Sequence, residues 1–214
     1  MCGRYSLTNT TGLDERFNAE YPDEGIRPRY NAAPSQKMVI IPQSTPHHMQ
    51  LALWGFPISW IKDRPEGLIN IRAETISEKP SFKKYLKEGR CLILADGFYE
   101  WKKIDTKTKQ PYRITLKDEK PFAFAGVYKE AEGKLRFAII TTTPNSLMKD
   151  IHNRMPVILE KKEEQEWLMG PQNKAIEDML SDYPPASMKA YAVSKLVNTP
   201  MNDTPQIIRP VSIV

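Results

Sequence analysis

The chain contains very little cysteine: Cys2 and Cys91 are the only two among 214 residues, too few for a disulfide framework. A four-ligand zinc site would also need histidines, and the His47-His48 pair has no cysteine or carboxylate at ligand spacing. We therefore expect a surface loop at that pair, no metal and no cofactor. The sequence also lacks any run near the roughly 20 apolar residues of a membrane-spanning helix. Its first residues have neither the basic segment nor the apolar run of a secretory signal, so we expect a soluble, cytoplasmic protein.

Glycine-rich catalytic motifs are missing as well. No glycine-rich loop is present to hold a phosphate, and there is no Gly-x-Ser-x-Gly elbow, which argues against nucleotide-dependent and hydrolase-fold enzymes. The length and the 40% hydrophobic content support one domain, residues 1–214, with its own core. The net charge of +5 and the pI of about 9.1 suit nucleic-acid binding, although many mildly basic proteins bind nothing acidic. Nothing requires more than a monomer.

Short strand-like segments dominate the chain, with β-branched and aromatic residues between turn residues. We predict strands over residues 38–42, 50–54, 90–95, 112–116, 122–128, 135–141 and 190–193. We predict helices over residues 14–20, 81–88, 145–150, 162–169 and 175–180. Strands and helices do not alternate, which argues against a doubly wound parallel sheet. The pattern predicts an α+β fold with a mostly antiparallel, barrel-like β-sheet core and peripheral helices, and a solvated hairpin loop at the cationic run 102–109.

Cys2 has unusual chemistry if Met1 is removed, because a free α-amine then lies on the same residue as a thiol. Such an amine has a pKa of about 7.7–8.0, so roughly a fifth of it is neutral near pH 7 and available as a nucleophile. It can condense with an aldehyde to an imine, which the thiol closes into a five-membered thiazolidine. The alternative is that a cysteine occupies position 2 without any reactive role.

Glu100 and His152 are candidates for proton transfer. Glu100 lies between Tyr99 and Trp101 after an apolar strand, where partial desolvation would raise the pKa of its carboxyl group. It could equally be an exposed residue on an alternating strand. His152 titrates in the useful range, although a histidine near a loop is often structural or solvated.

Asn70, Arg72 and Glu74 alternate along the sequence and share one face if the segment is extended. A polar stripe of this kind suits the binding of a phosphate or the orientation of a reactive group, because arginine is a natural phosphate partner. The alternative is an edge strand that faces water.

Together these segments resemble the SRAP family, the SOS response-associated peptidase domain, whose members are also described as abasic-site processing proteins. The resemblance extends in order over nearly the whole chain. The matching segments are residues 1–5, 30–34, 54–56, 70–74, 96–101, 141–145 and 152–156, with a weaker tail at 197–198 and 202–203. The resemblance implies the SRAP fold and a covalent chemistry on abasic sites in single-stranded DNA. In this chemistry Cys2 forms a thiazolidine crosslink with the sugar aldehyde and shields the lesion, alongside imine or lyase steps.

The resemblance also implies the roles of individual residues. Cys2 would be the nucleophile, Asn70 would hold the forming adduct, and Glu100 and His152 would move protons. The DNA-binding residues would be Arg4, Arg72 and Arg154 at flanking phosphates and Asn31, Pro34 and Thr142 lining the site. One or two of the aromatic candidates for stacking on bases would take part: Trp54, Trp60, Tyr99 and Trp101. On DNA, the protein would be found at the nucleoid.

Two other functions remain open. The family's older description is a cysteine peptidase that removes its own N-terminal extension, although Met1 alone precedes Cys2 here and an ordinary aminopeptidase would suffice. A non-catalytic single-stranded DNA-binding protein is the other alternative. A chain that keeps Met1 has an acylated Cys2 nitrogen, so we expect that form to bind DNA without crosslinking to it.

Overall fold

The computed structural model describes residues 2–58 and 66–212. Its centre is a closed barrel of five strands in the order β10 (Lys134–Thr142), β4 (Gln50–Trp54), β3 (Lys37–Pro42), β6 (Arg90–Ala95) and β9 (Phe122–Ala131). Strand β9 pairs back onto β10 and closes the circle. The short strands β5 (Asn70–Arg72) and β11 (Met155–Pro156) lie along β10. Strands β4 and β5 run parallel to β10, and the other pairings in this sheet are antiparallel.

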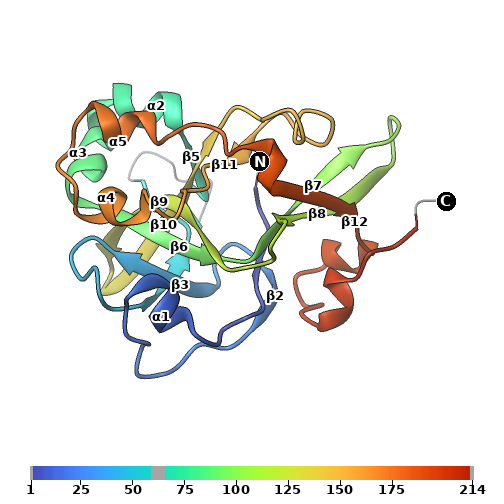
Figure 1. The fold of residues 1–214 in the computed structure, drawn as a ribbon, viewed down its shortest axis with the longest axis horizontal. Coiled ribbons are helices and arrows are strands. Elements are labelled where there is room, and N and C mark those ends of the chain that lie inside the picture. Colours follow the sequence, from blue (N-terminus) through green and yellow to red (C-terminus); the bar gives the residue numbers. More distant parts are fainter. Residues whose placement is uncertain (1, 59–65, 213–214) are drawn as a thin grey trace.

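A second sheet is antiparallel throughout and has the strand order β12-β8-β7-β1-β2. Its strands are β1 (Tyr5–Leu7), β2 (Arg29–Ala32), β7 (Gly97–Lys103), β8 (Lys109–Leu116) and β12 (Met188–Ala192). Figure 1 shows the β7–β8 hairpin extending away from the barrel beside β12. The loop 104–108 at its tip is exposed or half-buried, which confirms the hairpin interpretation of the cationic run 102–109.

The helices are short and peripheral. They are α1 (Leu13–Phe17), α2 (Ala73–Glu78), α3 (Pro80–Glu88), α4 (Glu164–Met169) and α5 (Lys174–Asp178), with 3₁₀ turns η1 (Pro185–Ser187), η2 (Lys195–Asn198) and η3 (Pro205–Ile208). Helices α2 to α5 gather on one side of the barrel (Figure 1). In the described part of the chain, none of the helices combines the length and the apolar character needed to cross a membrane. The predicted α+β class with a barrel-like, mostly antiparallel core is confirmed.

The barrel strands bury both faces because they pack against two different layers. One cluster joins barrel residues such as Val39 and Ile41 to helix residues such as Phe82 and Trp167. The other joins the alternating barrel residues to the second sheet and includes Cys2. Burial on both faces explains why these strands are almost continuously apolar in sequence. It also places Cys2 where the two sheets meet.

The seven predicted strands are present, and the turn at Glu132-Gly133 joins β9 to β10 with positive φ values of 55° and 66°, which suit a tight hairpin. The predicted helix over 145–150 is wrong. That segment forms consecutive turns, because the Asn145 side chain accepts the Met148 N–H and the chain turns again at Met148. Helix α2 was not predicted, and strands β1 and β2, with three and four residues, are too short for their patterns to predict them.

Candidate active site

Pairing between the first strand and β7 positions Cys2. Tyr5 lies opposite Phe98, and the Tyr99 N–H donates to the Arg4 carbonyl at 3.0 Å. The chain ahead of Tyr5 therefore continues alongside β7 and brings Cys2 near Glu100, whose charge acts on the thiol. Cys2 is fully buried, and its Sγ lies 3.7 Å from the Arg4 carbonyl oxygen. Burial, and after it the Glu100 carboxylate, raise the pKa of the Cys2 thiol far above its ordinary value.

Asn70 fixes the backbone of Cys2 from the opposite sheet. Strand β5 runs parallel to β10, with Asn70 opposite Ile139, and this pairing directs the Asn70 amide to the N-terminal segment. Its Nδ2 donates to the Cys2 carbonyl at 2.9 Å. Its Oδ1 is buried and has no hydrogen-bond donor within the described residues. A buried acceptor without a donor is costly, so this oxygen suits a donor on a bound molecule.

Glu100 and His152 form a polar pair beside Cys2. The Glu100 Oε2 lies 3.8 Å from the His152 Nε2, and the carboxylate is 3% exposed. Burial raises the pKa of Glu100 to about 7 and lowers the pKa of His152. The His152 Nδ1 lies 3.1 Å from the Arg154 N–H and 3.3 Å from the Arg154 carbonyl oxygen, so the backbone of Arg154 holds the imidazole ring in place and leaves Nε2 on the side of Glu100. Near pH 7 the pair can therefore give or accept a proton at little cost.

Arg4 and Asn31 both hold the segment 197–202, far away in sequence. Arg4 donates to the Val197 carbonyl at 2.9 Å and also reaches that of Asn198. The Asn31 amide donates to the carbonyls of Val197, Thr199 and Asn202 at 2.9–3.2 Å, and its side chain is fully buried. Asn31 therefore positions this segment and does not present a side chain to solvent. That Asn31 also lines the DNA site stays a prediction.

The other predicted DNA-binding residues differ in how exposed their side chains are and in whether other residues already contact them. Arg72 is exposed at the end of β5, and Pro34 is half-buried in the turn after β2. Thr142 is buried at the end of β10, opposite Met155. Arg154 is also buried, and both of its terminal nitrogens contact the Glu74 carboxylate, at 2.6 and 3.0 Å. A phosphate contact at Arg154 would compete with this ion pair.

The aromatic residues that could stack on bases differ in how far they are buried. Trp54 and Tyr99 are fully buried, and each donates a hydrogen bond to a backbone carbonyl, so neither of these two candidates presents its ring to a base. Trp60 lies outside the described residues. Trp101 is half-buried beside Gly3 and Arg4 in a shallow open depression, and its Nε1 donates to the Asn198 side chain at 2.7 Å. Trp101 is thus the aromatic candidate that the described surface presents next to the N-terminal segment.

Sequence reasoning assigned no role to Asp203. Its carboxylate accepts the N–H groups of Tyr30 and Asn31 and pairs with Arg29 at 2.7 Å. Asp203 therefore adds to the contacts by which Asn31 holds the segment 197–202. We call these contacts of Arg4, Arg29 and Asn31 with residues 197–203 the C-terminal contacts. The weak motif at 202–203 was the available signal, but a motif alone does not say what a residue contacts. Within the described ranges, no group of three or more histidine, cysteine, aspartate or glutamate side chains is arranged to hold a metal ion.

Comparison with known proteins gives consistent results. The chain is 46% identical to "Abasic site processing protein YoqW" of Bacillus subtilis, with 97% of this chain and 99% of that protein covered. It is 32% identical to "Abasic site processing protein YedK" of Escherichia coli, with 99% and 100% covered. A crystal structure of a protein from Bacteroides thetaiotaomicron matches with a TM-score of 0.84 at 29% identity, covering 99% of this chain and 100% of that one. The family described as "SOS response associated peptidase (SRAP)" matches residues 1–200, so the chain belongs to this family.

Proposed function

We propose that this protein processes abasic sites in single-stranded DNA by forming a covalent thiazolidine with the lesion through Cys2. The observation that carries the proposal is the convergence on one residue: the Asn70 amide on the Cys2 carbonyl, with the Glu100–His152 pair beside it. The printed names of the relatives, which describe abasic site processing, support the choice of substrate.

The chemistry requires a free α-amine on Cys2, and hence the removal of Met1. The amine nitrogen attacks C1′ of the ring-opened sugar aldehyde, and loss of one water gives an imine. The thiol sulfur then adds to the same carbon, a C–S bond forms, and the S–H proton ends on the nitrogen. The same imine can also lead to lyase-type strand cleavage. Ring closure by the thiol competes with that cleavage, because both start from the imine.

The amine reacts before the thiol, because the sulfur adds to the imine carbon that the first step creates. The raised pKa of the buried Cys2 thiol agrees with this order, since a protonated thiol is a poor nucleophile. A cysteine peptidase needs the opposite, a thiolate beside a cationic group, because the thiolate is the attacking species. The environment of Cys2 therefore favours the crosslinking function over the peptidase alternative.

Glu100 and His152 supply the proton transfers in this proposal. Because burial raises the Glu100 pKa to about 7, both protonation states are populated near neutral pH. One form can take the proton of the attacking amine or thiol, and the other can protonate the departing water. The unpartnered Asn70 Oδ1 would accept from the adduct N–H or from the hydroxyl that ring opening releases.

DNA would reach Cys2 over the surface that carries Arg4, Arg72 and Trp101. Arg72 is exposed and Arg4 is partly so, which suits contacts to flanking phosphates, while the Trp101 ring suits stacking on an unpaired base. Asn31 contributes by holding the segment that Arg4 and Trp101 contact. Pro34, Thr142 and Arg154 remain predicted contacts around this surface.

The proposal is tested by mixing the protein with single-stranded DNA that carries one abasic site and separating the products on a denaturing gel. Intact mass first establishes that Met1 is absent. We expect a protein–DNA species that survives denaturation and is missing when Met1 is retained. Equal, salt-sensitive binding to intact and abasic strands without any covalent species would instead identify a simple DNA-binding protein. Cleavage of a short peptide extension placed before Cys2, without DNA crosslinking, would identify a peptidase.

A further inference from the structure

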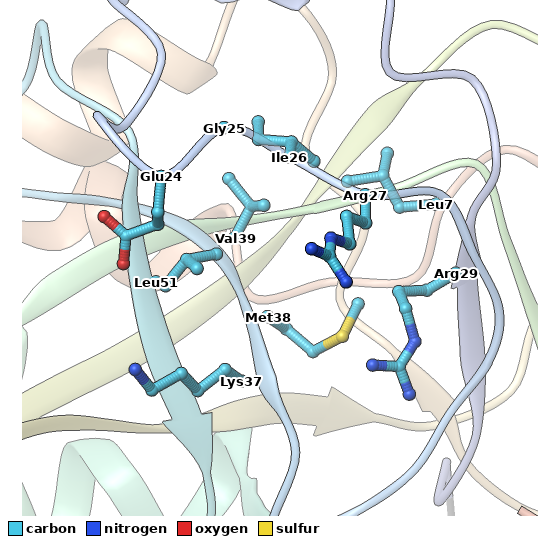
Figure 2. Close-up of a pocket in the computed structure, with 10 residues that line it drawn as sticks. All are labelled: Leu7, Glu24, Gly25, Ile26, Arg27, Arg29, Lys37, Met38, Val39 and Leu51. Carbon is cyan, nitrogen blue, oxygen red and sulfur yellow. The ribbon is translucent and has the colours of Figure 1, made fainter. Parts of the chain in front are cut away.

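A pocket of about 290 Å³ lies away from Cys2, at the other end of strand β1 (Figure 2). Leu7 lines it, and strand pairing places Leu7 opposite Arg29, whereas Tyr5 pairs with Ala32 nearer to Cys2. Leu7 and Cys2 also belong to different core clusters, Leu7 to the cluster with the helices and Cys2 to the cluster between the two sheets. The residues that line it include none of the predicted catalytic or DNA-binding residues, so the described pocket is separate from the candidate active site.

The interior of the pocket is apolar. Leu7, Met38 and Val39 form it and are each only 1–2% exposed, and the half-buried Ile26 and Leu51 complete the walls. Figure 2 shows the side chains of Val39 and Leu51 next to each other, with Leu7 across from them and Met38 below. A surface of this kind is stabilised when an apolar group from another molecule covers it, because that contact removes apolar area from water.

The rim of the pocket is cationic. Arg27 and Lys37 are exposed, and neither forms an ion pair within the described part of the chain. Arg29 also faces the pocket, although its guanidinium is already engaged by Asp203 at 2.7 Å. Among the described lining residues Glu24 is acidic; it is exposed, and its carboxylate lies on the same side of the view as the Lys37 amine and away from the two guanidinium groups (Figure 2). The rim therefore has two cations available to an anionic ligand.

A nucleotide matches this lining poorly. Among the described residues that line the pocket, none has an aromatic ring on which a base could stack or a side-chain amide or hydroxyl that could pair with base edges. A buried base would lose its hydrogen bonds to water without replacement. An acidic peptide with one apolar side chain matches both properties, since the apolar group covers the interior and carboxylates meet Arg27 and Lys37.

We propose that this pocket binds a short acidic peptide segment of a partner protein, with one apolar side chain seated on the half-buried Ile26 and Leu51, which pack against Leu7 and Val39 beneath them. Carboxylates on either side of that side chain pair with Arg27 and Lys37. Since the pocket and Cys2 lie at opposite ends of β1, the bound peptide leaves the N-terminal segment uncovered. A partner held in this way would be joined to the protein without occupying the site that acts on DNA.

The test uses a fluorescein-labelled synthetic peptide with three aspartates next to one leucine, and fluorescence anisotropy as the readout. The variant R27E/K37E reverses both free rim charges, and K134E/K161E, at exposed positions outside the pocket, changes the net charge by the same amount. We expect R27E/K37E to weaken peptide binding about tenfold or more and the control to change it less than about twofold. Replacing the peptide's leucine by serine should also weaken binding about tenfold.

Three results with the peptides would overturn the proposal: no peptide binding below roughly 1 mM, equal weakening by the control variant, or equal binding of the serine peptide. Thymidine monophosphate that binds in competition with the peptide and loses affinity in R27E/K37E would identify a nucleotide site instead. DNA crosslinking is measured on the same samples. Because Arg27 and Lys37 lie outside the catalytic machinery, unchanged crosslinking shows that the variants are folded and keeps this result independent of the proposed function.

Discussion

The two cysteines occupy superficially equivalent places and differ in what surrounds them. Cys2 and Cys91 are both fully buried, both belong to the cluster between the two sheets, and burial raises the thiol pKa of both. For Cys91, in the middle of the sheet, burial is the single cause of that rise, as expected of a residue that fills space. Cys2 has Asn70 on its carbonyl and the charge of Glu100 near its thiol.

This difference shows that burial and thiol pKa alone do not identify a reactive cysteine. By thiol acidity, neither residue resembles a conventional nucleophile. What distinguishes Cys2 is the set of polar groups held around its backbone and the α-amine it would carry once Met1 is removed. The reactive group in the proposal is thus the nitrogen first and the sulfur second.

The largest expected effect comes from Cys2→Ser, compared with Cys91→Ala. The serine variant keeps the α-amine and forms an imine but cannot form a thiazolidine, so the stable crosslink should be lost completely. Borohydride should still trap the imine of Cys2→Ser, whereas Cys91→Ala should crosslink like the unmodified protein. The measurement is crosslink yield on a denaturing gel with and without borohydride. Stable crosslinking by Cys2→Ser, or its loss in Cys91→Ala, would remove the distinction between the two cysteines.

Removal of the proton-transfer groups should have the next largest effect. Glu100→Gln and His152→Ala should each slow crosslink formation or reversal by about 10²–10⁴-fold, because each removes a general acid or base. Rapid-quench time courses on abasic single strands give these rates. Thr115→Val, at another buried polar side chain in β8, serves as a control and should leave the rate unchanged. A rate in Glu100→Gln within about twofold of the original would exclude proton transfer by this carboxylate.

Asn70→Ala should slow crosslinking by about tenfold, a smaller effect, since it removes one hydrogen bond to the Cys2 carbonyl and one acceptor for the adduct. The single-turnover rate at saturating DNA measures this loss separately from binding. Asn70→Asp keeps the acceptor and removes the donor, so the two variants together separate the contributions of Nδ2 and Oδ1. If both variants react at the original rate, Asn70 does not position Cys2.

The pH dependence of stability should distinguish Glu100 from Cys91. The folded Glu100 carboxyl has its pKa raised from 4.5 to about 7, so between these values the folded state binds more protons than the unfolded state. The stabilisation that the protonated Glu100 carboxyl gives to the folded state is fully present below pH 4.5 and is lost as the pH rises through 7. Urea unfolding between pH 5 and 8 should show this decline in the original protein, a smaller decline in Glu100→Gln, and an unaltered slope in Cys91→Ala.

Cys91→Ala should have the smallest effect, a decrease of about 1 kcal/mol in the free energy of unfolding, because it leaves a small cavity among packed strands. Urea or thermal denaturation measures it. An unchanged stability would show that the surrounding strands close over the vacated volume.

Much of the barrel was predictable because its strands are apolar over five or more residues and end at turn residues. The elements that position the site were less visible in sequence. Strands β1 and β2 have three and four residues, and their pairing depends on partners far along the chain. The helix predicted at 145–150 fails for a similar reason, since the Asn145 side chain competes for a backbone N–H group.

The sequence predicted which residues form the candidate site, but it did not predict which of their side chains contact one another. The resemblance to the SRAP family already indicated four site residues, and the structure brings them together: Cys2, Asn70, Glu100 and His152. Burial could not be read from the pattern for Asn31, Trp54 or Tyr99, because an extended segment does not reveal which of its faces another layer covers. Residue pairs such as Arg154 with Glu74 join distant segments and become visible only in the folded chain.

The C-terminal contacts, which join Arg4, Arg29 and Asn31 to residues 197–203, cannot form until nearly the whole chain has been synthesised. Arg4 and Asn31 find their partners on carbonyls of Val197 to Asn202, and Arg29 finds its partner in Asp203. A chain still emerging from the ribosome lacks these partners, so the segment bearing Cys2 is exposed long before its surroundings can assemble. Under the proposed function, the site around Cys2 would therefore be completed late in folding, and a nascent chain that has lost Met1 would carry the aminothiol before these contacts form.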